Sequence, residues 1–200
     1  MTIHELLLKR FATKKFDPTK KVSDEDLQYV LEAARLSCSS SNTQPWHITV
    51  ITNPELRAEL RPVSYGQAQV TDASHLLVLS ALNDATPRIM RTMELIREKA
   101  GEASAESYQK MANGSVPTAP EARASMLKAQ TYLALQAMIL AAADRGLDSC
   151  PMGGFDAAKY AEILGFTDKM PVALLTLGYA LEPGFAKIRV PMEDMVEYRN

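Results

Sequence analysis

The spacing of apolar residues along the chain predicts helices and strands in alternation. One helical face ends near Leu36 and comprises Leu27, Val30, Leu31 and Ala34. Two near-continuous apolar runs, 75–82 and 172–177, have the length of strands, and such runs are typical of strands covered on both faces of a sheet. Between residues 46 and 51 apolar and polar residues alternate, which indicates a half-buried strand that begins with Trp46 as a core residue.

Capping residues mark where the first helices begin. Thr2 followed by Glu5 has the pattern of a capping box and opens a short helix over Leu6–Lys9, because each side chain accepts a hydrogen bond from a free backbone N–H of the first turn. Ser23 with Asp26 repeats the signal before the helical face described above. The N-terminal part of the chain is therefore expected to hold two helices before the first strand.

The middle of the chain is predicted to hold two long helices. The breaks around them are expected at Asn113-Gly114, Pro117 and Pro120. The first helix spans roughly 88–111, and its many charges suggest that it lies over a pocket, to which Tyr108 or Met111 would contribute.

The second helix is expected over 120–145, and Gly146 suits the left-handed residue that often ends a helix. It has an apolar face that comprises Met126, Leu133, Ala137 and Leu140. We expect this face to contact either the core or another subunit.

These elements together predict an α+β fold in which helices surround a central sheet. The 200 residues, 46% of them hydrophobic, suffice for one sizeable core, so residues 1–200 are expected to form a single domain. The net charge is −2, and acidic and basic residues are interspersed. This pattern gives no basic footprint for nucleic acid and no polybasic arm for a membrane.

Neither a membrane segment nor a metal site is expected. The longest apolar run, near 133–143, contains Gln136 and is far short of the roughly 20 residues that span a bilayer. The first residues lack the basic and apolar regions of a signal peptide, so we expect a cytoplasmic protein. Cys38 and Cys150 are too few for a disulfide framework, and the three histidines form no ligand pair.

Two pairs of basic residues lie near opposite ends of the chain, Arg10 with Lys14 and Lys187 with Arg189. A guanidinium group offers a fork of N–H donors that matches phosphate oxygens, and an ammonium group adds a point charge. Together the pairs would neutralise a dianionic phosphate, with about 1.5–3 kcal/mol from each charge-assisted bond. Spacing alone would favour solvated surface charges, so phosphate binding needs support from the residues between the pairs.

The segments between and around these pairs resemble those of the flavin-dependent nitroreductase family. Five stretches match in the family's order from residue 10 to residue 191. They are the Arg-x-x-x-Lys-x-Phe segment at Arg10, the Ser-Ser-x-Asn-x-Gln-Pro-Trp loop at 39–46, residues 67–74, residues 151–155 and the Lys-x-Arg segment at Lys187. Five motifs in order over nearly the whole chain are hard to attribute to chance.

The resemblance implies a mostly antiparallel sheet and an intertwined homodimer with two equivalent FMN sites at its interface. The residues that correspond to the family's phosphate contacts are Arg10, Phe11, Ala12, Lys187 and Arg189. Lys14 and Gln69 correspond to residues at the pyrimidine edge, where a charge or donor stabilises the anion that develops as the flavin accepts hydride.

Two further segments complete the cofactor site that the resemblance implies. The loop Pro151-Met152-Gly153-Gly154 would lie flat against the flavin, where glycine lets a backbone N–H approach N5. Short polar side chains would reach the flavin from the neighbouring subunit, and they belong to the segment that contains Cys38, Ser39, Ser40 and Asn42.

Several positions depart from the family pattern. Gln69 replaces a usual lysine, so one full charge is missing and a lower flavin reduction potential is expected. Gly66 replaces a common asparagine, whose hydrogen bonds we expect Gln67 to supply. Gly153 stands where relatives often carry glutamate, and Cys38 where proline is common. Neither change removes a catalytic group, since FMN itself carries the chemistry.

The implied activity is transfer of hydride from NAD(P)H, as co-substrate, through bound FMN to a nitroaromatic, a quinone or a similar small-molecule acceptor by a ping-pong mechanism. Three alternatives remain open. A relative could use FMN to reduce an activated alkene or to remove a halogen, or the chain could be a flavin carrier or sensor with little turnover. A structural interaction module would make Arg10, Lys187 and Arg189 incidental.

Residues 72–75 have hydrolase residue types, but a triad depends on spatial geometry.

Overall fold

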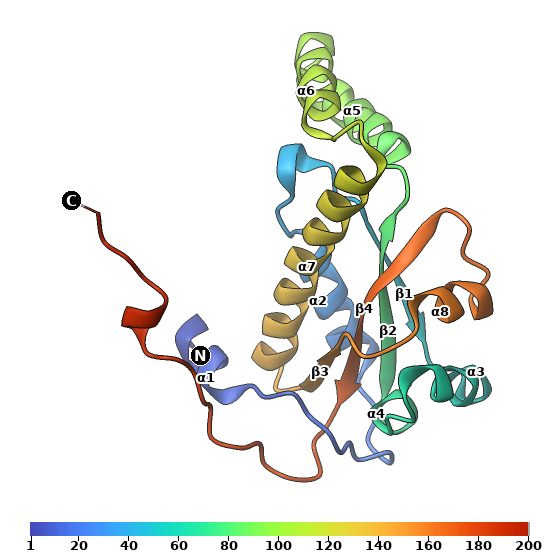
Figure 1. Cartoon of the computed structure of the whole chain (residues 1–200), viewed down its shortest axis with the longest axis vertical. Helices are drawn as coiled ribbons and strands as arrows, with labels where there is room; N and C mark the ends of the chain where they lie inside the picture. Colours follow the sequence, from blue (N-terminus) through green and yellow to red (C-terminus); the bar gives the residue numbers. More distant parts are fainter. Residues whose placement is uncertain (200) are drawn as a thin grey trace.

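A four-stranded antiparallel sheet forms the centre of the computed structural model, which describes residues 1–199 (Figure 1). The strand order is β1-β2-β4-β3. The strands are β1 (Trp46–Ile51), β2 (His75–Leu82), β3 (Asp148–Met152) and β4 (Lys169–Gly178). β2 buries Leu77 and Leu79 in one core and Leu76 and Val78 in the other, because successive side chains of a strand point to opposite faces.

Helices cover both faces of the sheet and extend beyond one end of it (Figure 1). The helices are α1 (Ile3–Lys9), α2 (Asp24–Arg35), α3 (Pro54–Leu60), α4 (Gln69–Asp72), α5 (Thr86–Ala100), α6 (Glu102–Ser115), α7 (Pro120–Asp144) and α8 (Ala157–Ile163). α2 and α7 lie on one face, α3, α4 and α8 lie on the other, and α5 and α6 project past the end of the strands. The α+β prediction and the antiparallel sheet are confirmed.

The local signals at helix ends and strands were largely correct. Thr2 and Glu5 form the capping box in full, and the Ser23 side chain accepts a hydrogen bond from the backbone N–H of Asp26. The three predicted strands are present, and Trp46 is buried in the core. Gly146 adopts a left-handed conformation with φ of 72°, which only glycine takes up without steric cost.

The prediction of two long helices in the middle of the chain was wrong. Three helices occupy this region, because Gly101 with φ of 83° separates α5 from α6. The break expected at Asn113-Gly114 is also absent, since α6 continues to Ser115. Packing of Ala105, Tyr108 and Ala112 against the rest of the molecule holds α6 together despite the glycine near its end. β3, α4 and α8 had no sequence prediction.

The apolar face predicted for α7 is not its core face. None of Met126, Leu133, Ala137 and Leu140 is buried, and Leu133 is 42% exposed. The core face instead includes Leu127, Thr131, Ala134, Leu135 and Met138. α7 therefore buries one apolar face against the sheet. Its second, open face is exposed at Leu133 and half-buried at Met126, Ala137 and Leu140, and Met126 also packs against the core. Contact with another subunit stays a prediction for the open face.

The two ends of the chain run beside each other along the β3 edge of the sheet. Ala12 forms a parallel bridge with Ser149, and Phe16 forms an antiparallel bridge with Ala180. A Cβ on Gly178 would lie 2.8 Å from the ring of Phe16, so the glycine allows this buried ring to pack. Beyond these bridges the C-terminal tail leaves the body of the protein and passes α1 (Figure 1).

The tail, residues 181–199, exposes many large apolar side chains. They are Leu181, Phe185, Ile188, Val190, Met192, Met195, Val196 and Tyr198. Phe185 is 98% exposed. So many exposed apolar side chains in one segment indicate a contact surface. Within residues 1–199, no helix combines the length and the apolar character required to cross a bilayer.

A buried arginine fixes α4, which begins with Gln69. Arg57 on α3 donates from Nε to the carbonyl of Val70 over 2.6 Å, and its terminal nitrogens donate to the carbonyls of Ala73 and Ser74. The side chain is buried, and burial lowers the pKa of its guanidinium. These carbonyls lie in or just after α4, so Arg57 satisfies acceptors that a short helix leaves open.

We predict that Arg57→Met lowers the free energy of unfolding by about 2–4 kcal/mol, because three buried carbonyls lose their donors. Urea unfolding followed by circular dichroism measures the change. Arg91→Met is the matched control, since Arg91 forms only an exposed ion pair with Glu94 and such pairs contribute at most about 1 kcal/mol. Equal stability of the two variants would contradict the role given to Arg57.

Candidate functional site

Three of the four basic residues singled out in the sequence meet where the chain ends come together. The Lys187 ammonium donates to the backbone carbonyl of Arg10 over 2.6 Å. Arg10, Lys187 and Arg189 line one cavity of about 370 Å³. The rest of its lining is Phe11, Ala12, Phe185, Ala186 and Ile188. Residues separated by nearly the whole chain therefore share one site.

The charges in this cavity repel each other and lack a counter-charge. Across residues 1–199, none of the ion pairs includes Arg10, Lys187 or Arg189. Burial, followed by the charge of Arg189, lowers the pKa of Arg10. Burial, followed by the charges of Arg10 and Arg189, lowers the pKa of Lys187. An anion in the cavity would relieve this repulsion, and Arg10 Nε is a buried donor without a partner.

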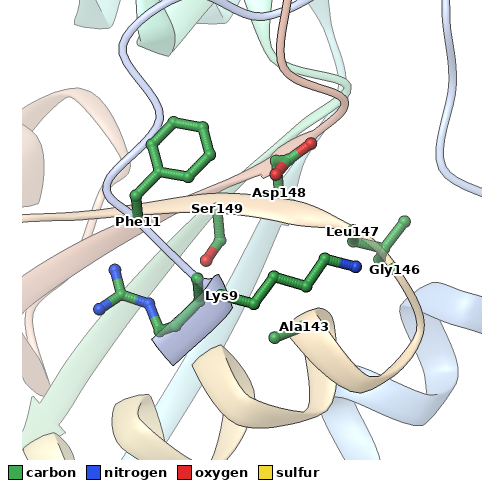
Figure 2. A pocket seen from close by; sticks show the side chains of 8 residues that line it. Lys9, Phe11, Ala143, Gly146, Leu147, Asp148 and Ser149 are labelled. Carbon is green, nitrogen blue, oxygen red and sulfur yellow. The ribbon is translucent and has the colours of Figure 1, made fainter. Parts of the chain in front are cut away.

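A smaller cavity of about 90 Å³ lies behind Arg10, between the end of α1 and the turn from α7 to β3. Figure 2 shows Lys9 extended beside Ala143 toward Gly146, while Phe11 turns to the other side of its segment. The carboxylate of Asp148 accepts a hydrogen bond from the backbone N–H of Ala180 over 2.8 Å. This bond ties the start of β3 to the start of the tail.

Close packing fixes the path of the tail over the N-terminal segment. A Cβ on Gly184 would lie 2.2 Å from the ring of Phe11, so no other residue fits there without displacing the ring. Thr13 is buried, its backbone N–H donates to Ser149, and its hydroxyl has no partner. Neither Gly184 nor Thr13 was predicted as a site residue from the sequence, although Thr13 lies inside the Arg-x-x-x-Lys segment.

Lys14 lies beside β3, the strand that leads into the glycine loop. Its ammonium is 3.6 Å from Sγ of Cys150, a buried thiol. Pro151 and Met152, expected in a loop, are the last residues of strand β3. Gly153 is exposed, and a Cβ on it would meet nothing within 4 Å. The loop is therefore carried by a rigid strand and is open on the side of Gly153.

Gln67 fastens the glycine loop to the segment before α4. Its side-chain nitrogen donates to the carbonyl of Gly154 over 2.8 Å and to that of Ser64 over 3.0 Å. The ring of Tyr65, a residue with φ of 55°, also lies against Gly154. Gln69 is 6% exposed and begins α4. Gln67 thus positions the loop, a role that the sequence did not reveal.

The loop that contains Cys38, Ser39, Ser40 and Asn42 does not join the other residues within one chain. The backbone N–H of Ser40 donates to the Gln130 side chain near the middle of α7, whereas Arg10 lies beside Ala143 near the C-terminal end of that helix. Thirteen residues of helix separate Gln130 from Ala143, which corresponds to about 20 Å. The loop and Arg10 therefore form two groups at different positions along α7, the loop near its middle and Arg10 near its end.

The hydrolase residue types at 72–75 do not form a triad. The Ser74 hydroxyl lies 3.0 Å from Nδ1 of His75, and it also accepts a hydrogen bond from the backbone N–H of Val22. The carboxylate of Asp72 accepts instead from the Thr71 hydroxyl. Ser74 thus serves the packing of this region.

Comparison with known proteins gives consistent matches over nearly the whole chain. The model of the Nitroreductase family matches residues 7–179. A proposed NAD(P)H nitroreductase of Staphylococcus haemolyticus is 35% identical over 203 residues, which covers 94% of this chain and 93% of that protein.

Solved structures show the same architecture. A proposed nitroreductase from Exiguobacterium sibiricum, solved in complex with FMN, has a TM-score of 0.88 at 26% identity and covers 100% of this chain and 98% of its own. A proposed NAD(P)H:FMN oxidoreductase from Staphylococcus epidermidis has a TM-score of 0.92 at 22% identity, with 99% and 96% covered. The second likeness bears on the fold alone.

We predict that binding of a phosphate monoester at alkaline pH takes up protons. The lowered pKa of Lys187 means that its ammonium loses its proton at a lower pH than an ordinary lysine does, and a bound dianion raises that pKa again. Affinity should therefore fall as the pH rises through the lowered pKa. Calorimetry with ribose 5-phosphate, in buffers of different ionisation enthalpy at one pH, measures the uptake. Undiminished uptake in Lys187→Met would exclude Lys187 as the source.

Proposed function

Since the chain belongs to the nitroreductase family, we propose that it is an FMN-dependent oxidoreductase that uses NAD(P)H as co-substrate. The observation that carries the proposal is the cavity where Arg10, Lys187 and Arg189 meet without a carboxylate. Its charge suits one terminal phosphate, and the sequence has no Gly-x-Gly-x-x-Gly fingerprint for a dinucleotide. FMN rather than FAD is therefore the proposed tight ligand, bound by a single domain over residues 1–200.

The remaining site residues suit the flavin ring. Lys14 lies beside β3 with its charge toward Cys150, and we assign Lys14 and Gln69 to the pyrimidine edge. Pro151, Met152 and Gly153 would face the ring, and the open side of Gly153 leaves its backbone N–H accessible. Bound FMN would supply a carrier that accepts hydride from NAD(P)H and passes it on. The protein's part is to bind, orient and tune it.

The two groups of site residues meet only if two subunits assemble. The Ser39–Asn42 loop of one subunit would complete the cavity of its partner, since about 20 Å of α7 separates the groups within one chain. The open apolar face of α7 and the apolar tail offer surface for this contact. Obligate homodimers commonly bury about 2,000–5,000 Å². We propose an intertwined homodimer in which each tail wraps the neighbour.

A ping-pong mechanism follows from one open face. NAD(P)H would occupy the face beside Gly153, leave after hydride transfer, and be replaced by a nitroaromatic or quinone acceptor. Met111 is exposed, whereas Tyr108 is buried, so of these two residues Met111 remains a candidate for contact with the acceptor. Reduction of an activated alkene, dehalogenation and a carrier or sensor role with little turnover are the alternatives.

The absorption spectrum of the purified protein tests cofactor binding, and mass spectrometry of the heat-released cofactor identifies it. We expect FMN in stoichiometric amounts and steady-state NAD(P)H oxidation with menadione or nitrofurazone. FMN without turnover would favour the carrier or sensor. A colourless protein that does not bind added FMN would refute the proposal, and recovery of FAD alone would refute the phosphate argument.

Mixed dimers test whether each site is shared between subunits. Arg189→Ala alone should weaken FMN binding by about 1.5–3 kcal/mol, and Asn42→Ala should weaken it as well. A dimer of one Asn42→Ala subunit and one Arg189→Ala subunit should keep one tight site, because both lesions fall in the other site. Titration of apoprotein with FMN counts the tight sites.

The matched control is a dimer of one wild-type subunit and one subunit with both substitutions. If the sites are shared between subunits, the two substitutions fall in different sites, so no tight site should remain. If the loop and the basic residues of one subunit form the same site, the outcomes are reversed. The dimer of the two single variants then has no tight site, and the dimer with one wild-type subunit has one. A flavin-loaded monomer in light scattering at micromolar concentration would also contradict the model.

A further inference from the structure

The loop between α2 and β1 has an unusual backbone. Ser41, Asn42 and Gln44 have φ of 48°, 52° and 45°, although L-residues other than glycine rarely adopt the left-handed region. Among residues 1–199, only Tyr65 is another such residue outside glycine. A segment with this conformation persists only when its surroundings hold it.

Three different helices hold the loop through its backbone. The Tyr108 hydroxyl on α6 donates to the carbonyl of Asn42 over 3.2 Å, and Oε1 of Gln130 on α7 accepts from the N–H of Ser40 over 2.8 Å. Arg88 on α5 donates to the carbonyl of Gln44 over 3.2 Å. Tyr108 is 6% exposed, and burial raises the pKa of its phenol, so it remains a donor at neutral pH.

These bonds leave side chains of the loop free to meet a ligand. The backbone N–H of Gln44 donates to the Ser39 hydroxyl, and the side-chain amide of Gln44 donates to the side-chain oxygen of Asn42. The Ser40 hydroxyl and the Asn42 side-chain nitrogen appear in none of the hydrogen bonds of residues 1–199, and both residues are exposed. The strained backbone therefore presents these groups outward.

We propose that Tyr108 and Gln130 are positioning residues that hold the loop 39–44 in the conformation that binds the partner's FMN. The inference rests on the proposed function. It also makes α6, which packs against the loop, a determinant of cofactor retention: a displacement of α6 that breaks the Tyr108 bond weakens FMN binding in the neighbouring site.

The test compares two tyrosine variants of the full-length protein. Tyr108→Phe removes only the hydroxyl. Tyr132→Phe is the control, because the Tyr132 hydroxyl on α7 donates to the carbonyl of Val172 in β4 and not to the loop. Titration of apoprotein with FMN should give a dissociation constant raised roughly 3- to 10-fold in Tyr108→Phe and unchanged in Tyr132→Phe. Gln130→Met, of similar volume, should also raise the dissociation constant.

A double-mutant cycle separates positioning from general stability. In an Asn42→Ala background Tyr108→Phe should have little further effect on FMN affinity, because Tyr108 acts through this loop. Hydrogen exchange of amides 40–44 should be faster in Tyr108→Phe apoprotein. Unchanged affinity in Tyr108→Phe, or full additivity with Asn42→Ala, would overturn the inference and leave the proposed function standing. Failure of wild type to bind FMN would overturn both.

Discussion

The arrangement of the chain ends depends on contacts that hold Arg10, Lys187 and Arg189 together against the repulsion of their charges. The tail approaches the N-terminal segment through the bond from Lys187 to the Arg10 carbonyl and through the contact of Gly184 with Phe11. Both contacts bring like charges together, and no carboxylate offsets them within residues 1–199. A bound dianion would replace repulsion with charge-assisted bonds of about 1.5–3 kcal/mol each. We infer that cofactor binding and the order of the tail are thermodynamically linked.

The length of α7 keeps the loop and the basic cavity apart within one chain, so one chain does not complete the proposed site. Gln130 anchors the strained loop near the middle of the helix, and Ala143 borders the basic cavity near its end. A rigid helix does not shorten, so in the proposed homodimer the loop beside each cavity comes from the second copy. The open apolar face of α7 and the exposed tail supply the hydrophobic surface that such an assembly would bury.

Rigid and strained parts of the proposed site have different supports. The glycine loop follows strand β3 and is fastened by Gln67, so its position derives from the sheet. The loop around Asn42 has an unfavourable backbone and depends on bonds from three helices. Preorganisation of this kind lowers the entropy lost when a ligand binds. It also makes the second loop sensitive to changes in the helices that hold it.

The sequence by itself determined the local features. Capping by Thr2 and Ser23, the strands at 46–51 and 75–82, and the left-handed Gly146 follow from interactions between near neighbours. The ordered motifs also identified the family, because several short motifs in the same order remain recognisable even when the overall sequence identity to relatives is modest.

Only the tertiary structure decided which residues meet. Packing kept α6 helical through Asn113 and Gly114, and sheet pairing made a strand of β3 despite Pro151. The core took a different face of α7 from the one that includes Leu133, since two apolar faces of one helix look alike in a sequence. The partners of Arg57 and Tyr108, and Gly154 as a partner of Gln67, lie 13 to 87 residues away. Contacts over such separations depend on the path of the whole chain, which no local pattern encodes.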